Sequence, residues 1–498
     1  MPYLLAHDLG TSGNKAVLYD SCGNLIKSRT HSYPLFISNG NWAEQRAEDW
    51  WEAVCLTTRE LLEGINPAEI AAVSFSGQMM GCLCVDEKGT PLRNAMIWAD
   101  LRSTKEEQFV RSQIEEERFY KITGHRISPA YGGFKFLWLK NNEPDIYRKT
   151  FKTLNAKDFI LFRLTGNFLT EFSDASSLCL MDLNQFEWSD EILEICGLDK
   201  KKMPELRRSI DLAGYVSREA AAQTGLLEGT PVVCGGGDGS CAAVGAGCVK
   251  KGIANCVLGT SSWISITNPT PIFDPEMTTF NFAHIVPGCV MPTGTMQCGG
   301  GSLSWVAQTL NAEYEEIRTS VRETSPGAKG LIFLPYLIGE RSPRWDADAR
   351  GAFIGLTLEH GRGEMVRAVL EGVAMNLDVV LNVFRRYESI DELVAIGGGA
   401  RNDVWLQIFA DVFNARMIKP NYLEEATSMG AAITAGVGVG LFDSFDVVDI
   451  FLKRDEEFVP NAQHAVFYEQ IKPIFDECYH NLKGTFGAIS RASSNTSR

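Results

Sequence analysis

Residues 3–19, YLLAHDLGTSGNKAVLY, place a glycine-rich turn, residues 8–14, between two apolar runs. Apolar runs on either side of such a turn predict two antiparallel strands. A second turn at residues 21–24 leads into a third run, residues 25–28. We therefore predict an antiparallel meander at the N-terminus.

The second half of the chain holds a weaker copy of this pattern. Residues 253–265, IANCVLGTSSWIS, again place a Gly-Thr-Ser turn between two apolar runs. We therefore predict two domains with the same core, residues 1–250 and residues 251–485, divided near Lys250. A polar tail, residues 486–498, is expected to be frayed.

Helical and extended patterns alternate along both halves. An amphipathic helix is predicted over residues 47–62 and a buried strand over residues 70–75. In the second half, a long amphipathic helix over residues 364–387 precedes a strand over residues 393–396. The middle, residues 101–208, is more helical and is expected to be an insertion over the first sheet. This alternation predicts an α/β fold with covered, mixed sheets.

Composition and charge narrow the classes of partner. The chain has 498 residues, 45% of them hydrophobic and 22% charged, and a mean hydropathy of -0.07, the profile of a globular protein. Its 62 acidic residues outnumber 47 basic ones and give a net charge of -15. This charge repels phosphate backbones and anionic lipids, so neither nucleic acid nor a membrane is expected as a partner. A bound nucleotide must be held locally, by backbone amides, a helix N-terminus or a metal.

The cysteines and histidines favour a reducing compartment and no zinc site. The 13 cysteines are scattered without a CxxC pair, which predicts free thiols in the cytoplasm. The N-terminus lacks the basic region of a secretory signal, so none is expected. The longest charge-free apolar stretch, residues 430–442, is too short and too glycine-rich to span a bilayer. None of the 7 histidines lies within four residues of another, which disfavours zinc.

The turn at residues 8–14 is a candidate phosphate site. Its backbone N–H groups could surround a phosphate while Asp8 faces a magnesium ion. A plain hairpin with Asp8 as a turn residue is the alternative. The second copy at residues 258–261 favours the functional interpretation, because two such turns could hold one polyphosphate from both sides of a cleft.

Two glycine-rich segments follow predicted buried strands. Residues 235–239, GGGDG, place Asp238 at a strand end among residues too small to fill the space, which predicts an open cavity. Asp238 could accept the proton of a hydroxyl that attacks phosphorus, or it could simply cap the next helix. Residues 397–400, GGGA, would let a ligand approach the backbone closely, or form a tight turn. Asn402 breaks the GxGxxG pattern and no P-loop motif is present.

Taken in chain order, these motifs resemble those of the FGGY family of carbohydrate kinases, and most of all its xylulose kinases. The resemblance runs from Tyr3 to about Ser444, nearly the whole chain. The family's second signature is matched over residues 351–371, whereas its first is matched only over residues 135–142. The other matching segments are residues 8–13, 42–45 with 50–51, 76–79, 97–98 with Asp100 and Arg102, 235–238, 258–261, 333–337 with 339–343, and 397–401.

The resemblance implies a fold similar to that of actin, hexokinase and the heat-shock ATPases, with two ribonuclease-H-like domains that close over ATP in an interdomain cleft. The N-terminal domain would bind the sugar and the C-terminal domain the nucleotide. Asp238 would be the general base and, with Asp8, would hold magnesium. The implied ATP positions are Gly10, Thr11, Gly259 and Thr260 beside the phosphates and Gly300, Gly399, Ala400 and Asp403 along the adenosine; the implied substrate positions are Gln78, Met79, Met80, Trp98, Asp100 and Asp238.

The chain departs from the xylulose kinases in the sugar pocket. Where they carry Gln-Met-His-Gly, Trp-Asn-Asp and Gly-Gly-Gly-Asp-Asn, this sequence has Met80, Ala99 and Gly239 at the polar positions. Because sugar hydroxyls are costly to bury unpaired, such a pocket is expected to discriminate differently among acceptors. We expect phosphoryl transfer from ATP, with Mg²⁺, to a hydroxyl of a small sugar or polyol. Gluconate, a sugar alcohol and a signalling polyol stay open as acceptors.

Two non-catalytic interpretations also stay open. The first is an actin-like nucleotide switch whose output is a protein contact; sugar-stimulated ADP production would exclude it. The second is a sugar-sensing regulator, which would need a DNA-reading element. The sequence shows neither a basic patch nor a spare helix-turn-helix segment. Assembly as a homodimer is left open by the sequence.

Overall fold

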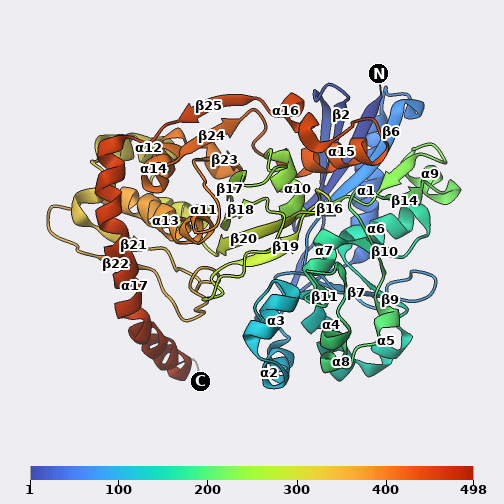
Figure 1. The fold of residues 1–498 in the computed structure, drawn as a ribbon, viewed down its shortest axis with the longest axis horizontal. Coiled ribbons are helices and arrows are strands. Elements are labelled where there is room, and N and C mark those ends of the chain that lie inside the picture. The colour runs from blue at the N-terminus through green and yellow to red at the C-terminus, as the bar shows by residue number, and fades with distance from the viewer. Residues whose placement is uncertain (1, 497–498) are drawn as a thin grey trace.

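The first half of the chain is built on a seven-stranded sheet. The computed structural model describes residues 2–496, and Figure 1 shows two lobes side by side, with the N-terminus in one of them. The order in the first lobe is β14-β15-β6-β1-β2-β3, and β16 also pairs with β6. The strands are β1 (Tyr3–Leu9), β2 (Gly13–Asp20), β3 (Leu25–Ser32), β6 (Ile70–Gly77), β14 (Leu212–Tyr215), β15 (Pro231–Val233) and β16 (Gly236–Gly237).

The predicted meander is confirmed, and both faces of its first strand are covered. β1 and β2 are antiparallel, as are β2 and β3, whereas β1 and β6 are parallel. Leu5 and Leu9 pack into one apolar core and Leu4 and Ala6 into another. Because successive side chains of a strand point to opposite faces, the continuous apolar run of β1 fits a sheet buried on both sides.

The second lobe repeats this arrangement, which confirms the internal echo. Its sheet has the order β19-β20-β18-β17-β23-β24-β25. β17 pairs antiparallel with β18 and parallel with β23, as β1 pairs with β2 and β6. The strands are β17 (Ala254–Leu258), β18 (Ser262–Ile266), β19 (Phe280–Ala283), β20 (Val290–Met296), β23 (Glu392–Ile396), β24 (Arg416–Pro420) and β25 (Arg454–Phe458).

Long helices cover both sheets. α1 (Ala47–Leu62) has the bounds predicted for it, and α13 (Arg362–Arg385) begins two residues before its predicted start. The tail expected to be frayed is instead the end of α17 (Ala462–Thr496), which runs along the outer edge of the second lobe; residues 497–498 lie outside the described residues. The other helices here are α6 (Ala156–Thr165), α9 (Arg218–Thr224), α10 (Asp238–Gly245), α11 (Gly300–Thr309), α12 (Tyr314–Glu323) and α14 (Asp403–Phe413).

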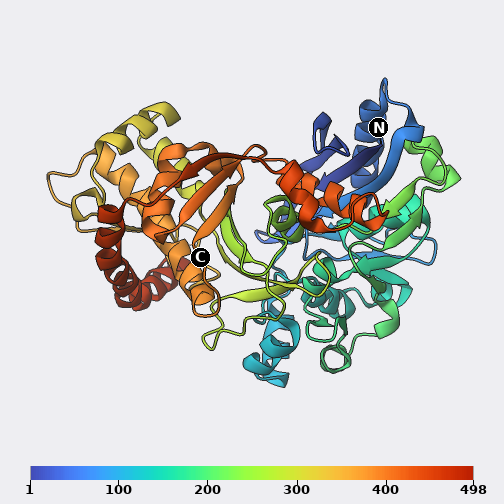
Figure 2. The same cartoon turned by 45° about the horizontal axis from the view of Figure 1, so that its top comes forward.

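One helix of the second half packs against the first lobe. α15 (Ala426–Gly438) shares an apolar core with β1 and β2, and Figures 1 and 2 both show it beside the N-terminal strands. α15 crosses α10 at very short range, because a Cβ atom on Gly430 would lie 2.0 Å from the carbonyl oxygen of Cys241. The glycine-rich apolar run therefore makes a close helix crossing. No helix in residues 2–496 is long and apolar enough to cross a membrane.

The middle segment is largely helical, as predicted, and adds small sheets to the first lobe. Outside this segment, α16 (Val448–Phe451) follows α15 in the chain. The elements of the middle, besides α6, are α2 (Thr104–Gln113), α3 (Glu116–Thr123), α4 (Gly132–Asn142), α5 (Pro144–Lys149), α7 (Phe172–Ser176), α8 (Asp190–Cys196), β9 (Lys152–Leu154), β10 (Leu169–Glu171), β11 (Met181–Asp182), β12 (Glu187–Trp188) and β13 (Glu205–Arg207). The strands outside the middle that remain are β4 (Phe36–Ser38), β5 (Trp42–Gln45), β7 (Leu83–Val85), β8 (Ala95–Met96), β21 (Ile332–Leu334) and β22 (Ala352–Ile354).

Candidate active site

The sheet of the first lobe brings Asp8 and Asp238 together. β6 lies between β1, which carries Asp8, and β16, which leads directly into Asp238. All three strands are parallel, so their carboxyl ends meet at one edge of the sheet. Ser76, at this end of β6, donates from Oγ to Asp8 Oδ1 at 2.8 Å. Asp8 and Asp238 are each partly rather than fully buried, so neither residue is sealed beneath a helix.

The electrostatics of the pair fit a site for a divalent cation. Burial, followed by the charge of Asp8, raises the pKa of Asp238 to about 7. Burial also raises the pKa of Asp8, against the opposing effects of Ser76, Thr427 and Lys15. No cluster of three or more potential metal ligands occurs among residues 2–496. Two carboxylates that disfavour each other's charge fit Mg²⁺, which typically takes one or two carboxylates and completes its shell with phosphate and water.

Asp238 is not the N-cap of α10, and two of the glycines before it are closely packed. The N-cap is Gly237, although Asp238 Oδ1 accepts from the backbone N–H of Gly239 at 2.7 Å. A Cβ atom on Gly235 would lie 2.0 Å from Phe75 O, and one on Gly237 would lie 2.6 Å from Met79 Sδ. Close packing therefore fills the space beside Gly235 and Gly237, whereas a Cβ atom on Gly239 would meet only Met291 Cε, at 3.6 Å. The open space predicted around Asp238 is thus limited to the side of Gly239.

The first glycine-rich turn lies beside a predicted sugar residue. Trp98 Nε1 donates to Thr11 Oγ1 at 2.8 Å, and Gln45 Nε2 donates to Thr11 O at 2.6 Å. Gly10 N–H donates to Gly13 O at 3.0 Å and closes the turn. Trp98 is 43% exposed. The structure therefore places a predicted phosphate residue, Thr11, in contact with a predicted acceptor residue, Trp98.

The predicted nucleotide positions of the second lobe gather around the second turn. Gly300 N–H donates to Gly259 O at 2.8 Å, and Gly301 N–H donates to Thr260 O at 3.0 Å. A Cβ atom on Gly399 would lie 3.0 Å from Leu258 O, so the turn before α14 packs against the same strand end.

Two of the residues predicted to lie along the adenosine have side chains that are buried or already paired. The side chain of Ala400 is buried, which leaves its backbone as the part that a ligand could contact. Asp403 accepts from Lys419 Nζ at 2.8 Å, and Arg318 Nη2 lies 3.8 Å from its other oxygen. The Asp403 carboxylate is therefore already neutralised by cations of the same lobe.

Lys15 was missed by the sequence interpretation. It stands opposite Asp8 in the β1–β2 register and forms a 2.8 Å ion pair with Glu425, just before α15. The adjacent Glu424 pairs with Arg401 at 2.8 Å. The loop before α15 therefore joins the first turn to the turn predicted to lie along the adenosine. A hairpin register drawn through residues 8–15 would have paired Lys15 with Asp8.

In the segment predicted to bind the acceptor, residues 78–80, two side chains make internal contacts. Gln78 is buried and donates from Nε2 to Gln45 Oε1 at 2.7 Å, and Met79 is buried against Gly237. Met80 is partly exposed, with a positive φ of 64°. Positive φ is uncommon for a residue with a Cβ atom and marks a constrained backbone.

A buried lysine that the sequence interpretation did not use as a site residue holds this segment. Lys135 Nζ donates to the carbonyl oxygens of Met80, Ile97 and Ala130 at 2.8, 2.7 and 2.6 Å. Burial lowers the pKa of Lys135 to about 7. Lys135 therefore fixes three chain segments around the predicted acceptor pocket.

Asp100, another predicted acceptor residue, is fully engaged by internal contacts. It is fully buried, accepts from the backbone N–H of Ala43 at 2.7 Å, and pairs with Arg102 Nη2 at 2.6 Å. The guanidinium of Arg102 stacks on the ring of Trp42 at 3.8 Å. The geometry gives Asp100 a role in holding the loop that carries Trp98.

Comparison with known proteins agrees with this geometry. The model of the N-terminal domain of the FGGY family of carbohydrate kinases matches residues 3–245, and that of the C-terminal domain matches residues 254–439. The chain belongs to the FGGY family of carbohydrate kinases. It is 34% identical to a xylulose kinase of Lactococcus lactis over 97% of each chain, and 31% identical to a gluconokinase of Bacillus licheniformis over 98% of each.

Solved structures of FGGY kinases share the fold. The chain resembles a ligand-bound xylulose kinase from Lactobacillus acidophilus with a TM-score of 0.94 and 28% identity, over 98% of this chain and 100% of that one. It resembles a gluconate kinase from the same organism with a TM-score of 0.93 and 28% identity, over 98% and 99% of the two chains. This FGGY kinase is thus a two-domain α/β phosphotransferase that uses ATP and Mg²⁺ and acts on an alcohol group of a carbohydrate.

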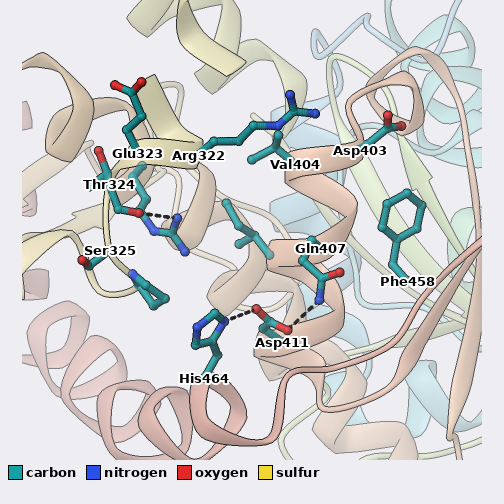
Figure 3. A pocket seen from close by; sticks show the side chains of 13 residues that line it. Arg322, Glu323, Thr324, Ser325, Asp403, Val404, Gln407, Asp411, Phe458 and His464 are labelled. Atoms are coloured by element: carbon teal, nitrogen blue, oxygen red, sulfur yellow. Dashed lines mark hydrogen bonds and ion pairs between the residues drawn. The ribbon is translucent and has the colours of Figure 1, made fainter. Parts of the chain in front are cut away.

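A pocket of about 540 Å³ in this FGGY kinase is lined by Asp403 but by no other residue predicted to contact the nucleotide. Asp403 lies at one side of it. Figure 3 shows His464 and Gln407 directed at Asp411, which they contact at 2.8 Å each. His464, Gln407 and Asp411 thus satisfy one another, and Asp403 is the one predicted nucleotide residue in the lining. The pocket is therefore distinct from the predicted phosphate site.

As the predicted general base with a raised pKa, Asp238 should make the activity of the FGGY kinase fall at acid pH. A general base works ionised, so kcat/KM for the nucleotide should fall about tenfold per pH unit below a pH of about 7. In the pH profile of kcat, the fall should occur at lower pH than in the profile of kcat/KM, because a bound divalent cation favours the ionised carboxylate. Steady-state rates between pH 5 and 9, about two units either side of this pKa, would measure both profiles. A profile of kcat/KM that stays flat down to pH 5 would contradict the assignment.

Proposed function

We propose that this FGGY kinase transfers the γ-phosphoryl group of ATP to a hydroxyl of a small open-chain sugar or polyol bound in the first lobe. The observation that carries the proposal is the pair of carboxylates, Asp8 and Asp238, at one edge of the first sheet. The contact between Thr11 and Trp98 supports it, because it puts a phosphate turn next to a candidate acceptor wall.

In this proposal Asp238 acts on the acceptor as a general base. Its Oδ1 is held by the backbone N–H of Gly239, so Oδ2 is the atom that accepts the hydroxyl proton. The acceptor oxygen then bonds to the γ-phosphorus while the bridging P–O bond breaks and ADP leaves. When bound, magnesium ATP supplies the electrophilic phosphorus and neutralises charge on the departing phosphate.

The two lobes are proposed to share the nucleotide. Gly10 and Thr11 would contact the phosphates from the first lobe, and Gly259 and Thr260 from the second. Gly300, Gly399, Ala400 and Asp403 would lie along the adenosine, as the family pattern implies. Closure of the lobes would exclude water and so suppress hydrolysis of ATP. Asp8 would hold Mg²⁺ with Asp238.

The acceptor is proposed to be a ketose of the xylulose type or, as the second candidate, an aldonate such as gluconate. The gluconokinase relatives favour the second candidate. Gln78, Met79, Met80 and Trp98 would form the pocket wall, with Asp100 behind it. The wall carries few polar side chains, so the number of acceptor hydroxyls that find partners should decide the selectivity.

A panel of acceptors tests the proposed function directly. The purified full-length chain is assayed for ADP release with magnesium ATP and, in turn, ketoses, aldonates and alditols of four to six carbons. We expect at least one acceptor to raise ADP release well above the rate without acceptor, with product phosphorylation confirmed by mass. If no acceptor raises ADP release, the proposal is wrong and the nucleotide-switch interpretation gains support.

Three smaller proposals accompany the function. None of the 13 cysteines forms a disulfide, which supports the reducing cytoplasm as its compartment. Nucleic acid and membranes are not proposed as partners, because of the net charge of -15. Assembly as a homodimer stays a prediction that sedimentation would test.

A further inference from the structure

Arg341 of the second lobe reaches residues of the first. It follows β21, and its Nη2 donates to the hydroxyl of Tyr131, the residue before α4, at 3.4 Å. Its guanidinium lies 5.9 Å from the ring centre of Tyr131, 5.8 Å from Phe280 and 6.0 Å from Trp345. Arg341 is thus held by aromatic rings where the two lobes meet.

The guanidinium of Arg341 has no anionic partner among residues 2–496. Two neighbouring arginines do have one, because Arg126 pairs with Glu116 at 3.2 Å and Arg344 with Asp476 at 2.6 Å. Moreover, Arg341 Nε is buried and has no hydrogen-bond partner. A buried N–H without an acceptor is costly, so this donor calls for an acceptor that the chain itself does not supply.

Arg341 lies beside the wall of the proposed acceptor pocket. Met80 and Trp345 both pack against the same cluster of buried apolar residues, which includes Phe280. Tyr131 also contacts His125, whose pKa is lowered to about 3 by burial and then by Arg341. The charge of Arg341 also reaches Lys135, which holds Met80. The unpaired cation is therefore next to the segment that carries the proposed acceptor residues.

We propose that Arg341 binds a carbonyl or carboxylate oxygen of the acceptor sugar from the second lobe. An arginine has donors and no acceptor, so it pairs best with an oxygen that only accepts, and a charged donor strengthens the bond. A ketose carbonyl and an aldonate carboxylate share this chemistry, whereas the alditol of the same length lacks it. This inference rests on the proposed function and adds that the enzyme selects ketoses or aldonates over alditols.

The test compares Arg341→Met with the wild-type chain on three acceptors of equal carbon number: a ketose, an aldonate and the alditol. We expect kcat/KM for the preferred carbonyl or carboxylate acceptor to fall about 10- to 100-fold, the range for losing a charged hydrogen bond. The value for the alditol should change by less than about threefold, and KM for ATP should stay unchanged. The acceptor whose kcat/KM falls, the ketose or the aldonate, shows whether Arg341 binds a carbonyl or a carboxylate oxygen.

Arg126→Met is the matched control. Arg126 stacks on the same ring, Trp345, at 5.1 Å, but it already has a carboxylate partner. The control should leave the preference for ketose or aldonate over alditol intact. Arg341→Lys keeps the charge and loses the forked geometry, so it should show a smaller loss of preference, and it serves if the methionine variant does not fold.

The outcomes separate the two proposals. If the wild-type chain phosphorylates an acceptor but neither Arg341 variant changes the preference, or both lose all acceptors equally, Arg341 does not bind the acceptor oxygen. A wild-type enzyme that uses the alditol as well as the ketose and aldonate also overturns this inference. If no acceptor is phosphorylated at all, the proposed function fails, and this inference fails with it.

Discussion

Replacing Asp238 by asparagine should lower kcat by about 10² to 10⁴-fold, the usual contribution of a positioned general base. Asparagine has nearly the shape of aspartate but cannot take the proton of the attacking hydroxyl. The backbone N–H of Gly239 can still donate to the side-chain oxygen, so the loop should keep its position. In the proposed site Asp8 stays to hold Mg²⁺, and the side-chain oxygen of the asparagine can still contact the ion. The affinity for ATP should therefore change little, which separates loss of proton transfer from loss of binding.

The same substitution should leave the fold at least as stable as before. The raised pKa of Asp238 shows that the folded chain disfavours its charge, through burial and through Asp8. Folding therefore binds protons at this carboxyl, and its cost to stability grows as pH rises from about 4 to about 7. The neutral asparagine escapes this cost, so its advantage in melting temperature over the wild type should be larger at pH 8 than at pH 5.

Steady-state kinetics and thermal melting of Asp238→Asn check both expectations. Asp86→Asn is the matched control, because Asp86 lies in a hairpin turn of the same lobe, where its Oδ1 accepts from two backbone N–H groups. That control should keep full activity. An unchanged kcat in Asp238→Asn would show that Asp238 is not the general base.

Local patterns in the sequence predicted the fold well because the decisive contacts join neighbouring segments. The β1–β2–β3 meander is made by adjacent strands and short turns, and the echo at β17 and β18 follows the same local pattern. Asp238 was placed at a strand end because β15, β16 and the glycines precede it directly.

Contacts between distant segments could not be predicted in this way. The packing of α15 on the first lobe depends on Gly430 meeting Cys241, which are far apart in the chain. The roles of Lys135 and Arg341 depend on carbonyl groups and rings from several segments. A single sequence shows the residue types at such positions but not which of them meet.

The role of Asp100 could not be predicted from the sequence either. Its replacement is expected to cause a large loss of stability. The resemblance to the family implied a substrate residue, whereas the structure buries Asp100 completely in an ion pair with Arg102, itself buried. Removing one partner of a buried ion pair typically costs about 3 to 5 kcal/mol. Glu44 Oε1, 2.6 Å from Arg102 Nη2, would still compensate part of the charge of Arg102, so Asp100→Ala should lower the free energy of unfolding of the first lobe by an amount up to about this range.

A double-mutant cycle distinguishes the structural role of Asp100 from a role in binding the acceptor. Replacing a buried pair by apolar residues is often nearly neutral, so Arg102→Met combined with Asp100→Ala should recover most of the stability lost in Asp100→Ala alone. Glu44, the other partner of Arg102, keeps Arg93 in the double variant. Urea unfolding followed by tryptophan fluorescence measures each variant. If Asp100→Ala unfolds at the wild-type urea concentration and only raises KM for the acceptor, then Asp100 contacts the substrate and the buried ion pair contributes little.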